Sequence, residues 1–185
     1  MFYFVNNFPD QTDDVRTVCI KSTMSSMNEL FDFYKTALEF PYPYSKETRY
    51  NYNAFHEIMI ELDWLSEKEV RIIHDSLPPL EEDIMGDLYL DVLNLIDVEW
   101  EKRPECADIF RQYAEKHPNR FISFDEGGRR WWKEKPKIFN VYFRKRDESF
   151  VKDILYQYSW DYRKCMQFDE TGHIDIKNTD RYPRD

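Results

Sequence analysis

The chain has 185 residues, of which 42% are hydrophobic and 17% aromatic, and its formal net charge is −10. This apolar content, together with only 4 Gly, excludes a disordered chain and is enough for a sizeable core, so we expect one domain over residues 1–185. No apolar run approaches the roughly 18 residues that cross a bilayer, and the opening Met-Phe-Tyr-Phe-Val is too short for the apolar part of a signal peptide.

Strands and helices alternate along the first part of the chain. The β-branched run over residues 15–20 predicts a strand. Ser26 and Glu29 have the spacing of a capping box, and the apolar residues after them recur at steps of three and four. This pattern predicts an amphipathic helix that ends before Pro41, because a proline disfavours helical backbone in the residue before it.

A second helix and strand follow a loop that contains two prolines. The spacing over residues 51–62 predicts a short helix, and residues 69–75 predict a strand. After a Pro-Pro break, an apolar stripe predicts a longer helix that runs to about Trp100 and stops by Pro104. Residues 138–143 predict a third strand. Strands that alternate with helices pair in parallel through crossover connections.

Two segments lie outside this regular pattern. Residues 102–136 form an expected insertion, with a helix over 105–116. Residues 147–185 form an expected C-terminal extension, with helical spacing over 150–158. Within the extension, the runs 166–168 and 174–176 flank Thr-Gly and predict a hairpin. Both segments are rich in aromatic residues, so we expect them to pack on the core.

The short helix carries the most informative motif in the sequence. It reads Asn51-Tyr52-Asn53-Ala54-Phe55-His56-Glu57-Ile58-Met59-Ile60-Glu61-Leu62-Asp63-Trp64-Leu65. At 3.6 residues per turn, Phe55, Ile58 and Leu62 share a buried face. Asn53, Glu57 and Glu61 share a polar face, four residues apart. We expect Trp64 to anchor the end of this helix in the core.

This order of residues resembles the barstar family, whose members inhibit secreted ribonucleases inside the producing cell. The resemblance is clearest over residues 15–80. It implies an α/β fold with a small, mainly parallel three-stranded sheet packed with helices. The core would cover about 15–101 and 137–146, interrupted by the insertion at 102–136 and followed by the extension at 147–185.

The resemblance also implies where a partner binds, because the family's inhibitory surface is the first loop and the helix after it. Carried over to this chain, the partner-binding residues are Arg49 and Tyr50 in the loop and Asn53, His56, Glu57 and Glu61 on the helix. Three of them depart from the family pattern. Asn53 is neutral where an acid is usual, Arg49 replaces a small residue, and His56 stands where an aromatic residue is common.

The charge distribution agrees with a basic partner. Residues 47–101 contain 15 Asp/Glu against 3 Lys/Arg, a balance of −12. Such a surface attracts cationic proteins, although an acid-rich segment also serves solubility alone. The expected function is that of an immunity-type inhibitor, a cytoplasmic protein that blocks the active site of a basic, toxic nuclease, with a ribonuclease as the expected class.

A second hypothesis rests on residues 129–137, which contain 5 Lys/Arg and 2 Trp. Cations interleaved with aromatic rings bind nucleic acid through phosphate contacts and base stacking. The chain would then be a nucleic-acid-binding accessory protein. The acidic net charge favours the other interpretation, in which the tryptophans cover the core and the cations stay in water.

Signs of catalysis or of a cofactor are absent from the sequence. The histidines His56, His74, His117 and His173 have no metal-ligand spacing, and no phosphate-binding glycine loop or nucleophile motif occurs. The three cysteines have no ligand spacing either and predict reduced, buried thiols, as is usual in the cytoplasm. We therefore expect no catalytic residues, no metal, no cofactor, no small-molecule substrate and no membrane partner.

Overall fold

The structure, a computed structural model, describes residues 1–21, 23–24, 26–41, 52–77, 84–118, 137–158, 161–168 and 174–176. Its elements are, in chain order, β1 (Phe2–Val5), β2 (Val15–Ile20), α1 (Met27–Ala37), α3 (Tyr52–Met59), β3 (Glu69–His74), α4 (Ile84–Lys116), β4 (Ile138–Arg144), the 3₁₀ turn η3 (Lys145–Asp147), α6 (Glu148–Tyr158), α7 (Tyr162–Cys165), β5 (Met166–Phe168) and β6 (Ile174–Ile176). The chain has an α/β fold.

Four parallel strands form the main sheet, in the order β1-β4-β3-β2. The three strands that the sequence predicts are confirmed, but the expectation of a three-stranded sheet is wrong because β1 adds a fourth. All four residues of β1 are half-buried at the edge of the sheet. A strand of four residues is too short to show a clear alternation of apolar and polar side chains, and its pairing partner β4 lies far along the chain. The two strands meet where the amide of Val141 donates to the carbonyl of Met1 (3.0 Å).

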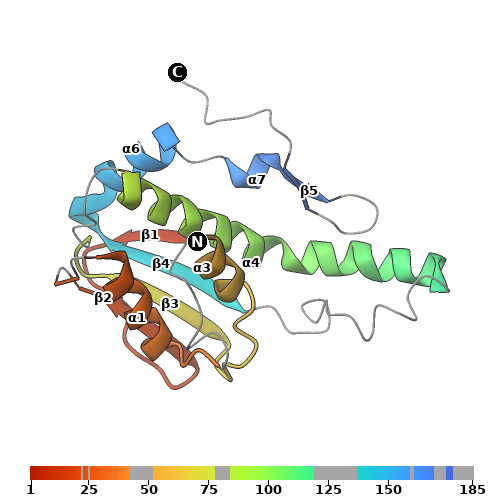
Figure 1. Cartoon of the computed structure of the whole chain (residues 1–185), viewed down its shortest axis with the longest axis horizontal. Helices are drawn as coiled ribbons and strands as arrows, with labels where there is room; N and C mark the ends of the chain where they lie inside the picture. The colour runs from red at the N-terminus through yellow and green to blue at the C-terminus, as the bar shows by residue number, and fades with distance from the viewer. Residues whose placement is uncertain are drawn as a thin grey trace.

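The core lies between one face of the sheet and the helices. Figure 1 shows α1, α3 and α4 on the same side of the strands. Along each strand every second residue points into this layer, as the pleat requires. Val18, Ile72 and Val141 form one buried row across the sheet, and each is 0% exposed. Side chains of α1, α3, α4 and α6 complete the same cluster.

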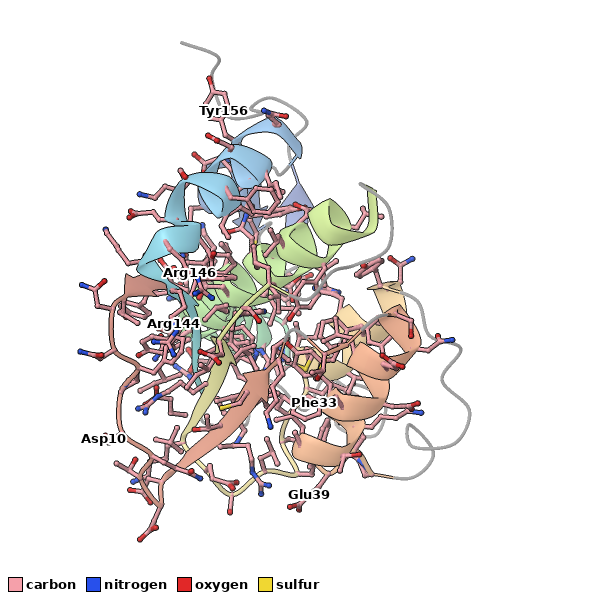
Figure 2. The ribbon with its side chains drawn as sticks, turned by 90° about the vertical axis from the view of Figure 1, so that its left-hand side faces the viewer. Asp10, Phe33, Glu39, Arg144, Arg146 and Tyr156 are labelled. Carbon is pink, nitrogen blue, oxygen red and sulfur yellow. The ribbon has the colours of Figure 1, made fainter. Side chains whose placement is uncertain are left out.

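The opposite face of the sheet carries polar and aromatic side chains. Tyr3 and Tyr142 stack there with their ring centroids 4.9 Å apart. Figure 2 views the molecule along a perpendicular direction and shows the segment with Asp10 on this side, away from the helices. Arg71 donates from Nη1 to the carbonyl of Asp10 (3.0 Å), and Arg144 donates to the carbonyl of Asn6 (3.0 Å). Two arginines of the sheet therefore hold this connection by its backbone.

Helix α1 begins as the sequence predicts. The hydroxyl of Ser26 accepts a hydrogen bond from the amide of Glu29 (3.3 Å), which satisfies one of the free donors of the first turn. Past the end of α1, Glu39 has a positive φ of 52°. The chain therefore turns sharply there, ahead of Pro41.

Helix α4 corrects the expected end at Pro104. It runs without a break from Ile84 to Lys116, with Pro104 inside it. An internal proline costs about 3 kcal/mol or more because it removes a hydrogen bond and crowds the preceding turn. The two residues before Pro104 make contacts that stabilise the helix here: Lys102 donates to the carbonyl of Met166 (3.0 Å), and Arg103 donates to the carbonyl of Ile60.

The C-terminal extension packs on α4, as expected from its aromatic content. The helix predicted over 150–158 is confirmed as α6, and the predicted hairpin is confirmed as the antiparallel pair β5 and β6. The hydroxyl of Tyr162 bonds the Asp91 carboxylate (3.0 Å), and Arg163 pairs with Asp97 (2.8 Å). The extension thus bonds two acidic side chains of α4, and Arg163 partly neutralises their charge.

Candidate functional site

Helix α3 is the element that the sequence singles out, and aromatic packing fixes it on α1. Its buried residues are Phe55, Ile58 and Met59. The ring of Phe55 lies 5.0 Å from that of Phe31 and 4.9 Å from that of Tyr34, measured between centroids. Burying each large apolar side chain contributes about 1.5–3 kcal/mol. An eight-residue helix is unstable in isolation, so this packing is what holds it.

Helix α4 fixes the C-terminal end of α3. The last carbonyls of a helix have no partner within it. Here Trp100 donates from its indole to the carbonyl of Met59 (3.0 Å), and Arg103 donates to the carbonyl of Ile60. The guanidinium of Arg103 also lies 3.8 Å from the ring centroid of Trp100. The end of α3 is therefore capped by side chains rather than by glycine.

The turn after α3 is anchored as well. The indole of Trp64 donates to the carbonyl of Leu38 (2.8 Å), and its ring meets that of Phe40 edge to face at 5.8 Å. The expectation that Trp64 packs against the core is confirmed. These contacts hold the turn after α3 against the residues that directly follow α1.

Three of the six sequence-predicted site residues form one exposed polar face. Asn53 and Glu57 are exposed on α3, and Glu61 is exposed in the turn that follows it. Their spacing of four residues places the first two on one side of the helix. The face therefore has one carboxylate on the helix and another just past its end. Arg49 and Tyr50 lie outside the described residues.

His56 has a partner within the chain. Its Nε2 atom lies 3.0 Å from Oε1 of Glu99 on α4, and the two side chains are 20% and 11% exposed. The sequence indicated His56 as a contact residue but gave no sign of Glu99, which lies 43 positions later. The pair forms a polar bridge between α3 and α4 beside the exposed face.

A buried polar chain lies beneath α3. The hydroxyl groups of Tyr34 and Tyr89 are 2.7 Å apart, and the Tyr89 hydroxyl is 2.8 Å from Nε2 of His74. All three side chains are fully buried. Burial raises the pKa of both tyrosines and lowers the pKa of His74 to about 3, so the imidazole is neutral at pH 7. The sequence singled out His74 only as one of four histidines without metal-ligand spacing.

The basic and aromatic segment is described only at its last residue, since residues 129–136 lie outside the described ranges. The ammonium of Lys137 donates to the carbonyls of Leu65 (2.6 Å) and Glu67 (2.8 Å). This cation joins the turn before β3 to the start of β4. Because the Lys137 ammonium bonds carbonyls of the chain itself, this residue does not support the hypothesis of nucleic-acid binding.

The described residues give no metal-binding group of three or more His, Cys, Asp or Glu side chains. Cys106 is buried as expected, but the expectation is wrong for Cys19, which is exposed on the outer face of β2, where no described helix covers it. The side chain of Cys165 lies outside the described set. Among the described helices, none is long and apolar enough to cross a membrane.

Comparisons with known proteins returned no family model, no curated protein and no solved structure that matches the chain.

Proposed function

We propose that the chain is an immunity-type inhibitor that uses the exposed face of α3 to block a basic, toxic nuclease, with ribonucleases as the expected class. The observation that carries the proposal is Glu57, an exposed carboxylate on a helix that is fixed by α1 on one side and by α4 on the other. A nuclease binds the phosphate groups of its nucleic-acid substrate with cationic side chains. A rigid carboxylate that fills that site without being cleaved acts as an inhibitor.

The arrangement of the elements supports the finer, barstar-like fold. In chain order β2, α1, α3, β3, α4 and β4 give a parallel unit of three neighbouring strands with helices on one face. Along the chain, the motif helix α3 comes after β2 and before β3, in the part of the sequence where the resemblance is clearest. In this proposal β1, the second half of α4 and the C-terminal elements are additions to that core.

Rigidity is the physical advantage of this site. Association costs free energy for every side chain and segment that becomes ordered on binding. The C-terminal end of α3 is already fixed through Trp100 and Arg103, and the turn after it through Trp64. A partner that docks on this face meets a carboxylate on a helix whose backbone is already held in place, so its cations gain attraction without ordering the helix. The proposed action needs neither a cofactor nor catalysis.

The test has two steps. The chain is immobilised, a basic nuclease is captured from extract of the native cell and identified, and the purified nuclease is assayed for RNA cleavage against rising inhibitor concentration. Glu57→Lys should then lose most of the inhibition while its thermal melting stays close to that of the wild type, because an exposed substitution changes stability little but brings like charges together.

The matched control is Asp153→Lys, which reverses an exposed carboxylate on α6. It changes the net charge by the same amount away from α3, so its inhibition should equal that of the wild type. Full inhibition by folded Glu57→Lys would refute the assignment of this face. An equal loss in both variants would mean that total charge, rather than the α3 face, matters.

A further inference from the structure

The buried chain of Tyr34, Tyr89 and His74 joins three elements of the fold. Tyr34 comes from α1, Tyr89 from α4, and His74 from the carboxyl end of β3, in the middle of the sheet. Each side chain is 0% exposed. The two hydrogen bonds, 2.7 Å and 2.8 Å long, therefore tie both helices to the central part of the sheet.

His74 is fully buried, and the described groups that contact it carry no negative charge. Its ring stacks on that of Phe143 at 4.4 Å and 11°. Its Nδ1 atom is buried and has no hydrogen-bond partner of ordinary geometry within the described structure. The backbone of Tyr142 lies close enough to oppose the fall in the His74 pKa, but it does not offset the effect of burial.

The titratable groups around His74 are tyrosines. Tyr89 and Tyr34 face it from α4 and α1, and Tyr52 at the start of α3 interacts electrostatically with Tyr89. From β2, Ile20 stands opposite His74 in the sheet register. The next residue, Asp75, is exposed and pairs with Arg144. No carboxylate is among the described groups that contact His74, so a proton on the imidazole would be a buried charge without a counter-ion.

We propose that the Tyr34–Tyr89–His74 chain is an acid-sensitive lock: the free-energy cost of a buried charge on protonated His74 opens the core and releases α1 and α4 from the sheet. A buried, unpaired cation is expensive, so the protonated imidazole forces the core to open towards water. Helix α3 rests on the same layer, because Phe55 packs on Tyr34 at 4.9 Å. Acid therefore also removes the support of the α3 face. This acid response belongs to the chain alone and does not depend on which partner it binds.

The sign of the pH effect follows from linkage. The pKa of His74 in the folded protein, about 3, lies below its ordinary value of 6.5, so the unfolded chain binds more protons. The stabilising effect is complete above about pH 6.5 and is lost as the pH falls. Between about pH 6 and pH 4, the unfolding equilibrium constant should rise about tenfold per pH unit from this group.

The test compares urea unfolding of the full chain from pH 7.5 to pH 5. Over this range Glu67 and Glu69, whose pKa values the partners Arg16 and Arg71 help to lower, stay ionised. His74→Gln keeps a polar group for Tyr89 but cannot titrate. The wild type should lose stability towards pH 5, while His74→Gln, less stable at pH 7.5, should show a much flatter dependence.

His117→Gln is the matched control, because His117 is exposed at the end of α4. It should keep the pH dependence of the wild type. Imidazole chemical shifts of the wild type provide a second measurement should His74→Gln fail to fold. The His74 ring should stay neutral until the protein unfolds. A folded protein in which His74 titrates near pH 6.5, or equal pH slopes for wild type and His74→Gln, would overturn the proposal.

Discussion

Replacing Arg103 by alanine tests whether α4 holds the proposed binding helix. Arg103 donates to the carbonyl of Ile60 just past α3 and lies 3.8 Å over the ring of Trp100. A hydrogen bond from a charged group contributes about 1.5–3 kcal/mol, and a cation–π contact at a partly exposed site about 0.5–1 kcal/mol. Arg103→Ala should therefore lower the free energy of unfolding by about 2–3 kcal/mol, allowing for the non-additivity of such neighbouring contacts.

The control lies on the same helix, two turns further on. Arg111 pairs with Asp108 within α4, and the two side chains are 57% and 60% exposed. Exposed pairs of this kind contribute about 0–1 kcal/mol. Arg111→Ala should therefore change the urea midpoint very little. The comparison separates the cap on α3 from the general effect of removing a cation from α4.

Amide hydrogen exchange shows where the loss occurs. The amide of Ile60 donates to the carbonyl of His56, and that of Glu61 to the carbonyl of Ile58. These two amides should lose protection in Arg103→Ala before the strands of the sheet do, because regions open locally as well as globally. Equal urea midpoints for Arg103→Ala and Arg111→Ala, with unchanged protection at the end of α3, would refute the reasoning.

Two further predictions concern the partner surface. The rate of association with a basic nuclease should fall as salt is raised, because the balance of −12 over residues 47–101 acts at long range and ions screen it; stopped-flow mixing across a salt series measures this, and a flat dependence would assign the acids to solubility alone. Changing Arg129, Arg130 and Lys133 together to alanine should leave inhibition intact. Tight, salt-sensitive RNA binding that this triple change abolishes would instead favour the nucleic-acid hypothesis.

Sequence patterns predicted the elements in which local periodicity is strong. The strand at 15–20, the capping box at Ser26 and the face of α3 that carries Phe55 all follow from residues within one or two turns of each other. The same local rules misplaced the end of α4. Pro104 weakens a helix by itself, and the contacts of Arg103 with Ile60 and of Lys102 with Met166, both distant in the sequence, stabilise α4 at this point.

Tertiary structure alone decided the contacts between distant residues. The pairing of β1 with β4, the bridge from His56 to Glu99 and the hydrogen bond between Tyr34 and Tyr89 each join segments more than 40 positions apart. Such contacts form only when the layers pack, and no local spacing encodes them. The sequence by itself determined that α3 has an apolar face and a polar face. The packing of α1 and α4 around it decided that the polar face is rigid and that His56 is turned towards Glu99.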